Sequence, residues 1–363
     1  MDPIYTARGF LPDPDPAHAF PPASPLARLD SLGRDLPSLL HDPGCRAYLR
    51  AQPIPPFDLP PDDPAYLPLL RLYYVRVGFL ASGYVNQVGQ PPEPVLPRNL
   101  AVPLAAACGL LGRPPILSYD GYALYNWRRF DPAGPVALGN IDTHQNFVHL
   151  YDEHWFVLVH VEIEAVAARV LAGIGRAATA LAAGDDGALD AALTGMTAAV
   201  WEMVQVLRRI PEKMDPAVYH RAFRPYIRFF EGVVYEGVSD APVSQRGETG
   251  AQSSVMPALV AFLKIPHRPS ALTDHLADMR GFMPAEHRAV LAEIERLLPV
   301  RPRAGRDTFN GLLEAVAAFR EVHYGWAELY IHQRVDDPRG TGGTPYRQWL
   351  RQLIDETLRF KIG

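Results

Sequence analysis

The segment from Tyr151 to Ala183 constrains the fold of this chain more than any other. Read as a helix, it carries apolar residues on nearly its whole circumference, and its main polar exceptions are His154, His160, Glu162 and Glu164. A helix that is apolar on all sides must be buried on all sides. We therefore expect it at the centre of the molecule.

The rest of the chain after this segment also has the pattern of helices. A break at residues 185–187 precedes a predicted helix from Ala188 to Ile210, and Asp215 with Pro216 has the residue types that begin another, which we extend to Phe230. Further helices are predicted at Ser254 to Leu263, Ala271 to Arg280, Pro284 to Leu298, Thr308 to His332 and Thr344 to Phe360. Alternation of β-branched residues is not sustained anywhere, so the predicted fold class is all-α.

Proline crowds the beginning of the chain. Because proline fixes its own φ and biases the preceding residue away from helix, helices are expected there only at Leu26 to Leu40 and Cys45 to Ala51, and the segment should wrap over other parts. Helices then follow at Tyr66 to Ser82, ending at Gly83, and at Asn99 to Leu111. We predict a small, Pro-rich, mainly helical domain at 1–146 that covers a large helical domain at 147–363.

Charge and cysteine content exclude several classes of protein. The 363 residues carry a net charge of −5 with basic residues scattered singly, which argues against a nucleic-acid partner. The two cysteines, Cys45 and Cys108, make neither a disulfide framework nor a zinc-finger site. Without a signal peptide or an apolar run of membrane-spanning length, a cytoplasmic protein with no membrane partner is expected. Arginine far in excess of lysine, with much alanine and proline, is typical of GC-rich bacterial coding.

His323 is the candidate metal ligand. It lies within an apolar stripe of helical period that consists of Leu312, Val316, Phe319, His323, Trp326 and Tyr330. A histidine in such surroundings must hydrogen-bond its ring nitrogens or give one to a metal. Arg320 lies one turn earlier and has the charge that a haem propionate requires. Taken alone, an ordinary core histidine is the more common case.

Two glycine-rich loops interrupt the helices. The first, Arg246 to Ser254, allows close backbone approach and leads into a helix whose free N–H groups can meet an anion, although an ordinary loop with a serine cap fits as well. The second, Gly340 to Thr344, lacks the ending of a phosphate-binding loop, so nucleotide binding is not expected. Its composition fits a surface loop or a substrate lid.

A third group of residues lies in the predicted helix that starts at Pro216. Tyr219, His220, Phe223 and Arg224 fall within little more than one turn, with His220 and Arg224 on one face. An arginine beside aromatic rings can bind a carboxylate with both nitrogens while the rings contact a planar apolar group. The alternative is a surface arginine that extends from a half-buried helix.

Several motifs together resemble the indoleamine 2,3-dioxygenase family. They occur in the order and roughly the spacing of that family, from Val95 to the C-terminus: residues 95–103 (VLPRNLAVP), 114–117 (PPIL), 233–237 (VVYEG), the loop of residues 247–254, His323, and the loop of residues 340–344. The resemblance implies a b-type haem in a helical large domain and insertion of O₂ across the 2,3 bond of an indole such as L-tryptophan, to give N-formylkynurenine.

The resemblance also assigns roles to individual residues. His323 matches the iron ligand and Arg320 the propionate partner. The implied substrate-binding residues are Arg224 for the carboxylate, Tyr219 and His220 against the indole, Tyr119, and Trp155 or Phe156. Thr249 and Gly250 fall over haem and substrate, and Thr341 belongs to the lid.

Some positions depart from the family pattern. Leu158 stands where many members have a small polar residue beside the O₂ site, with His160 two positions later, and Val260 replaces an acidic residue behind the haem. Two alternatives therefore stay open: a different haem-dependent indole oxidation in secondary metabolism, and a protein that only binds haem and O₂. The expected partners are O₂ and an indole amino acid, and the chain is expected to be a monomer or a weak homo-oligomer.

Overall fold

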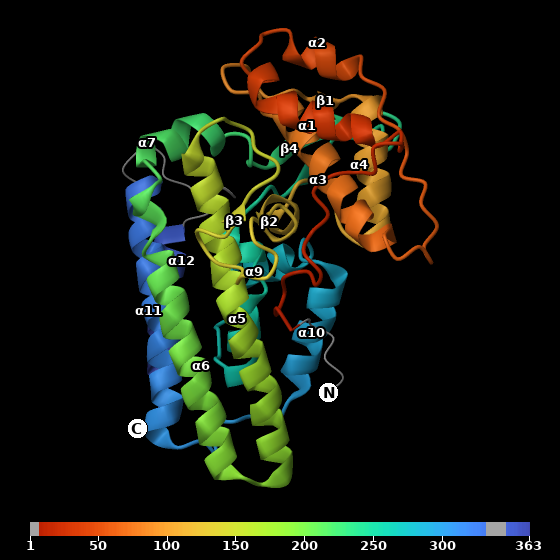
Figure 1. The fold of residues 1–363 in the computed structure, drawn as a ribbon. Helices are drawn as coiled ribbons and strands as arrows, with labels where there is room; N and C mark the ends of the chain where they lie inside the picture. Colours follow the sequence, from red (N-terminus) through yellow and green to blue (C-terminus); the bar gives the residue numbers. More distant parts are fainter. Residues whose placement is uncertain (1–6, 332–345) are drawn as a thin grey trace.

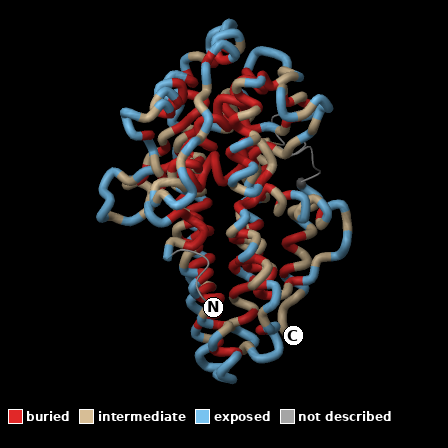
Figure 2. The backbone as a smooth tube through the Cα atoms, turned by 90° about the vertical axis from the view of Figure 1, so that its right-hand side faces the viewer, coloured by how far each residue is buried: buried red, intermediate tan, exposed pale blue. Residues whose placement is uncertain are grey.

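Four long helices form the lower body of the molecule (Figure 1). The computed structural model describes residues 7–331 and 346–363. In it, α5 (Tyr151–Ala183) and α6 (Asp186–Leu207) form an antiparallel pair, α11 (Arg306–Tyr330) packs on α6, and α12 (Tyr346–Arg359) packs on α11. The α5 bounds are those predicted, and the inward faces of these helices are buried (Figure 2). The fold class is all-α, as expected.

Local sequence explains how this body is joined. Gly184 adopts a φ of 72°, which ends α5, and the Asp185 carboxylate accepts a hydrogen bond from the Ala188 N–H to start α6. Asp190 on α6 then accepts hydrogen bonds from the Gly305 N–H (2.8 Å) and the Thr308 hydroxyl (2.7 Å). These bonds fix the start of α11, the helix that carries His323.

Three shorter helices follow in the chain: α8 (Val255–Leu263), α9 (Ala271–Arg280) and α10 (Ala285–Arg296). Of these, α8 packs on α5 and α10 packs on α8. The N-terminal segment runs down to this region in Figure 1. Phe10 packs on His287 of α10 at a centroid distance of 4.5 Å, and Gly9 lies against Ala168 of α5. The proline-rich segment therefore wraps over the large helical part, as the sequence indicated.

The upper part of the molecule contains α1 (Ala27–Leu39), α2 (Cys45–Arg50), α3 (Tyr66–Val85) and α4 (Arg98–Leu110). The buried Arg76 of α3 joins the segments around it, because its guanidinium donates to Asp30, the His144 carbonyl and Gln145. Within the described residues, no helix is both long and apolar enough to cross a membrane. The division at residue 146 stays a prediction, since one buried core runs through both parts.

Short strands appear that the sequence did not indicate. β4 (Phe230–Tyr235) pairs in parallel with β1 (Val95–Leu96) and antiparallel with β5 (Val243–Gln245), and β2 (Arg128–Arg129) pairs with β3 (Ile141–Asp142). The β1–β4 pairing joins segments far apart in the sequence. Pairs of this kind depend on tertiary contacts and leave no periodic signal in the sequence.

Two predicted helix ends were wrong. The helix begun by Asp215 and Pro216 does not reach Phe230: it consists of α7 (Pro216–Val218) and a π-helical turn, η3 (Tyr219–Phe223), before Pro225, which has no N–H to continue it. In contrast, α3 continues through Gly83 to Val85. Gly83 serves packing and does not end the helix, since a Cβ there would stand only 3.1 Å from a methyl of Leu40.

Candidate active site

His323 lies in the last third of α11, on the stripe that the sequence predicted. Leu312, Val316 and Tyr330 of this stripe are buried, and Trp326 donates its indole N–H to the Leu207 carbonyl at 3.1 Å. His323 is exposed, although the protein around its ring lowers the pKa of the imidazole to about 4.

The imidazole of His323 is therefore neutral at pH 7 and has a nitrogen lone pair for a metal. Within the described residues, neither ring nitrogen of His323 makes a hydrogen bond, so the ring is available to a ligand. No group of three or more His, Cys, Asp or Glu side chains that could hold a bare ion occurs in the same residues. An iron bound by His323 thus needs most of its ligands from a macrocycle, so the residues fit a haem.

Arg320 lies one turn before His323 and is buried. Its Nη1 donates to the Leu353 carbonyl at 2.8 Å and to the Thr357 hydroxyl, so one nitrogen is used to hold α12. Burial lowers the pKa of Arg320 to about 10, and within the described part of the chain Glu356 is the only charge that opposes this effect. An additional anion, such as a propionate, would stabilise the guanidinium.

His160 on α5 lies near His323: after burial, its charge is the only further cause of the lowered pKa of His323 among the residues that the structure describes. Its Nδ1 lies 2.7 Å from the Phe156 carbonyl, and donation to this oxygen leaves Nε2 as an acceptor. Phe156 packs on the His160 ring at 4.5 Å, and Tyr119 meets it edge-on at 6.0 Å. His160 and Phe156 therefore present one face of α5 to the site.

Leu158 does not share that face. It is buried, and it lies two residues, about 200° around the helix, from His160. Between the two aromatic candidates, Phe156 belongs to the cluster near His160. Trp155 instead donates its N–H to the Arg209 carbonyl at 2.9 Å and lies beneath Arg209 and Lys213, so it anchors α5 to the end of α6.

Tyr219 joins this cluster from the π-turn η3. Its ring lies 5.6 Å from Phe156, 5.3 Å from Phe223 and 5.7 Å from Tyr330 of α11. The turn is closed by the Arg224 N–H, which donates to the Tyr219 carbonyl at 3.0 Å. Single π-turns are frequent at functional sites.

The other two candidates of this turn are half-buried. His220 follows Tyr219, and Arg224 ends the turn. The charge of Arg224 contributes to the lowered pKa of Arg228, one turn later. Arg224 thus places a cation next to the aromatic cluster.

Tyr119 is buried directly before a second π-turn, η1 (Asp120–Leu124). Its hydroxyl donates to Glu164 of α5 at 3.0 Å, and the Ser253 hydroxyl donates to the same carboxylate oxygen at 2.7 Å. Burial raises the pKa of Glu164 to about 7 and that of the Tyr119 phenol well above its usual value. The Tyr119 N–H also donates to Gln252, so this π-turn holds the end of the glycine-rich loop.

The glycine-rich loop passes closely over the chain that follows Arg224. A Cβ on Gly247 would overlap the carbonyl oxygens of Ile227 and Arg228, so glycine is required there. Thr249 caps the short helix η4 (Gly250–Gln252), and a Cβ on Gly250 would meet no atom within 4 Å. Gly250 therefore borders open space, which a residue that lies over a cofactor requires.

Other predicted residues have other positions. The second glycine-rich loop with Thr341 lies outside the described residues. Val260 is half-buried on α8. The motif at residues 95–103 has a structural role: Asn99 donates to the Leu49 and Gln52 carbonyls, and the Arg98 N–H to Glu236.

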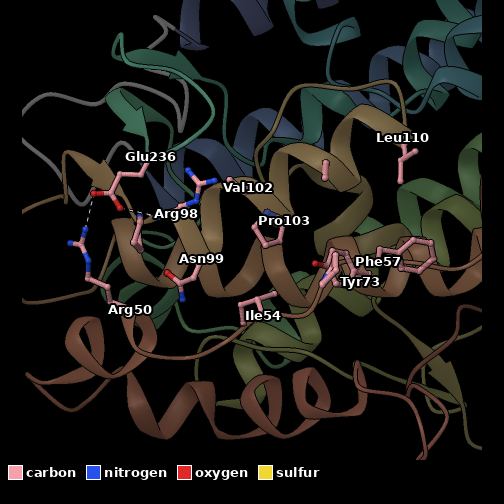
Figure 3. A pocket seen from close by; sticks show the side chains of 13 residues that line it. Arg50, Ile54, Phe57, Tyr73, Arg98, Asn99, Val102, Pro103, Leu110 and Glu236 are labelled. Carbon is pink, nitrogen blue, oxygen red and sulfur yellow. Dashed lines mark hydrogen bonds and ion pairs between the residues drawn. The ribbon is translucent and has the colours of Figure 1, made fainter.

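This motif also lines a surface pocket of about 550 Å³ between α2 and α4 (Figure 3). Ile54, Phe57 and Leu110 contribute its apolar wall, and Arg50 pairs with Glu236 at its edge. None of the residues expected to bind haem or indole lines this pocket, so it is not the candidate active site.

Three buried carboxyls around the two π-turns were missed from the sequence: Glu153 and Glu164 on α5, and Glu248 in the glycine-rich loop. Tyr122 was missed with them, and its hydroxyl donates to Glu153 at 3.0 Å. The only signal was the presence of acids in segments that are otherwise apolar or glycine-rich.

Comparisons with known proteins agree with this geometry. A model of the indoleamine 2,3-dioxygenase family matches residues 3–336. Indoleamine 2,3-dioxygenase 1 of Rattus norvegicus is 30% identical over 323 residues, covering 80% of this chain and 79% of that protein. The indoleamine 2,3-dioxygenase of Saccharomyces cerevisiae is 28% identical, covering 92% and 89%, and a myoglobin of Haliotis madaka 27%, covering 79% and 80%. Because the family model spans nearly the whole sequence, this chain belongs to the indoleamine 2,3-dioxygenase family of haem-dependent oxidoreductases.

Proposed function

We propose that this protein inserts both atoms of O₂ across the indole 2,3 bond of L-tryptophan or a derivative, to give a product of the N-formylkynurenine type. The observation that carries the proposal is the position of His323 on the apolar stripe of α11, one turn after the buried Arg320, with no hydrogen bond to either ring nitrogen within the described residues. The family membership and the names of the relatives support the same reaction class.

The cofactor of the proposal is haem b. His323 would bind its iron through a neutral nitrogen, and Arg320 would pair with a propionate through the guanidinium nitrogens that α12 does not use. When bound, the haem supplies the activation of O₂, so the protein needs no catalytic acid or base for that step.

The residues of the chain bind and orient the indole. Phe156, Tyr219 and Tyr119 supply aromatic surface around a flat ring, and Arg224 binds the substrate carboxylate. Nε2 of His160, left without a proton by the bond to Phe156, accepts a hydrogen bond from a substrate N–H. Orientation of the ring against the O₂ site is then the main contribution of the protein.

A second function is that of a haem and O₂ carrier, which the relatives named myoglobin favour. A carrier does not need a cation for an amino-acid carboxylate, so Arg224 discriminates between the two functions. Another haem-dependent indole oxidation stays open as well, because His160, Leu158 and His220 depart from the family pattern. We also propose a cytoplasmic location, with which the two buried, unpaired cysteines are compatible.

The decisive experiment offers L-tryptophan and O₂ to the purified, reduced, haem-loaded protein and follows the absorbance of an N-formylkynurenine-type product. Product formation is expected, and its absence with full haem occupancy would favour the carrier. The His323→Ala variant should lose stoichiometric haem, whereas His154→Ala, at a histidine bonded to Asp142 and Thr143, should retain it. Full haem retention and an unchanged ferrous–CO spectrum in His323→Ala would refute the ligand assignment.

A further inference from the structure

A second surface pocket lies between α1, β2 and the start of α5. Its volume is about 390 Å³, within the range of roughly 300–1,000 Å³ that is usual for small-molecule sites. Three arginines line it, Arg34 of α1, Arg76 of α3 and Arg128 of β2, whereas Asp30 is the only carboxylate among its described lining residues. Cations therefore exceed carboxylates in this pocket, although the chain as a whole has a net charge of −5.

One wall of the pocket is held in place by Arg76. Its guanidinium donates to Asp30 at 3.1 Å and to the Gln145 side chain at 2.9 Å. A further donor reaches the His18 carbonyl at 2.8 Å. Gly33 permits this packing, because a Cβ there would overlap the Gln145 amide. The wall thus joins the N-terminal segment, α1 and the segment before α5, and Asp30 already neutralises Arg76.

The other two arginines have no such anion. The guanidinium groups of Arg34 and Arg128 make no hydrogen bond or ion pair within residues 7–331 and 346–363, and Arg128 lies 6.0 Å from the Phe130 ring. Asp142 faces Arg128 across the β2–β3 pair, but its Oδ1 is already used, at 2.9 Å from His154 Nδ1. Two positive charges of the pocket therefore remain without a bonded carboxylate.

This excess charge acts on the buried groups of the wall. Burial lowers the pKa of Arg76, and the charge of Arg34 lowers it further, which Asp30 offsets only in part. Burial also lowers the pKa of His144 well below its usual value, and the charges of Arg76 and Arg128 contribute. An anion in the pocket would reduce this repulsion.

Asn146 gives independent evidence of a missing ligand. This residue is 9% exposed and lines the pocket, and its Nδ2 is buried without an acceptor among the described residues. The other amide atom, Oδ1, accepts a hydrogen bond from the Thr143 hydroxyl at 2.8 Å, so Nδ2 is the unused donor. Because a buried donor without an acceptor is destabilising, a ligand oxygen is its expected partner.

We propose that this pocket binds a phosphate group, as free phosphate or as the phosphate monoester of a small organic molecule. A dianion matches the two unpaired charges of Arg34 and Arg128, and the planar fork of a guanidinium suits phosphate oxygens. The amide of Asn146 supplies a neutral donor to the same ligand. Since none of the residues assigned to haem or indole lines this pocket, the site is separate from the candidate active site.

The test titrates the purified full chain by calorimetry with inorganic phosphate and with glycerol 3-phosphate, at constant ionic strength in chloride. Wild type should bind one equivalent of at least one of them. Arg34→Gln and Arg128→Gln should each weaken binding about fivefold to tenfold, because a hydrogen bond to a charged group is lost at an exposed, solvent-screened position. Tighter binding of glycerol 3-phosphate would identify a phosphorylated molecule as the ligand, and equal binding would identify free phosphate.

Asn146→Asp provides a second variant that should remain folded. It can still accept the Thr143 hydrogen bond, but it puts a carboxylate where a phosphate oxygen would lie, so it should abolish binding while the circular dichroism spectrum is unchanged. The control is Arg296→Gln, at an exposed arginine of α10 outside this pocket, which should leave both constants unchanged. No binding to wild type, or binding that the three pocket variants leave unaltered, would overturn the proposal. Equal weakening by Arg296→Gln would also overturn it, since it would show non-specific attraction to surface cations.

Discussion

Removal of the Arg224 side chain is expected to impair turnover of tryptophan far more than that of tryptamine, which has no carboxylate. A hydrogen-bonded charge contributes about 1.5–3 kcal/mol, and because Arg224 is half-buried, solvent screening favours the lower half of this range. A loss of about 1.5–2 kcal/mol corresponds to a fall in kcat/KM of about tenfold to thirtyfold. For tryptamine the lost partner does not exist, so a change below about threefold is expected.

The assay compares kcat/KM for both substrates by product absorbance, with the haem content of each variant measured by its Soret band. Arg228→Ala is the matched control, because Arg228 is exposed and its Nε donates only to the nearby Pro225 carbonyl at 3.2 Å. It should leave both substrates unaffected. An equal loss for tryptophan and tryptamine in Arg224→Ala would assign Arg224 to the support of the π-turn and refute its role in carboxylate binding.

Two further outcomes follow from the buried acid on α5 and from the start of α11. The pKa of Glu164 is raised from 4.5 to about 7, so the stability associated with its protonated form is full below pH 4.5 and is lost as the pH rises to about 7. Glu164→Gln can still accept both hydroxyl groups but does not titrate, so its free energy of unfolding should lose up to about 3 kcal/mol of this dependence on pH. Urea unfolding from pH 5 to 8 measures this, and the same change with pH in both proteins would contradict it. Asp190→Ala should lower the free energy of unfolding by about 1–2 kcal/mol, because it frees the Gly305 N–H and the Thr308 hydroxyl, and an unchanged urea midpoint would show that these bonds do not stabilise α11.

Much of the candidate site followed from the sequence because it lies on strongly periodic segments. The bounds of α5 and the apolar stripe of α11 depend on local spacing, and both could be predicted. The rotation of α5 about its own axis could not be predicted. Leu158 is the position that departs from the family pattern, whereas the structure turns Phe156 and His160 toward the site. Trp155 and Phe156 are adjacent in sequence, and only the position of α6 shows which one is used as an anchor.

The glycine-rich loop shows the same difference between local and tertiary information. Its glycines indicated close approach, which is present at Gly247. The serine cap that the sequence also allowed is absent, because Ser254 makes no capping hydrogen bond to α8, and Thr249 instead caps η4. No local pattern singled out Glu248, because its environment includes Tyr119 and Tyr122, more than a hundred residues earlier. The π-turns η1 and η3 were also missed, since each departs from the α-helix by a single residue.

The sequence by itself determined that the chain is helical, that α5 is central and that His323 stands on an apolar stripe, because helical periodicity and apolar content act over neighbouring residues. It also carried the family, through motifs spread over most of its length. Only the tertiary structure decided that His160 approaches His323, that Tyr119 and Ser253 share the carboxylate of Glu164, and that Glu248 is buried. These facts depend on which distant segments meet, and the free energy of a buried carboxyl or imidazole is set by those neighbours and not by its position along the chain.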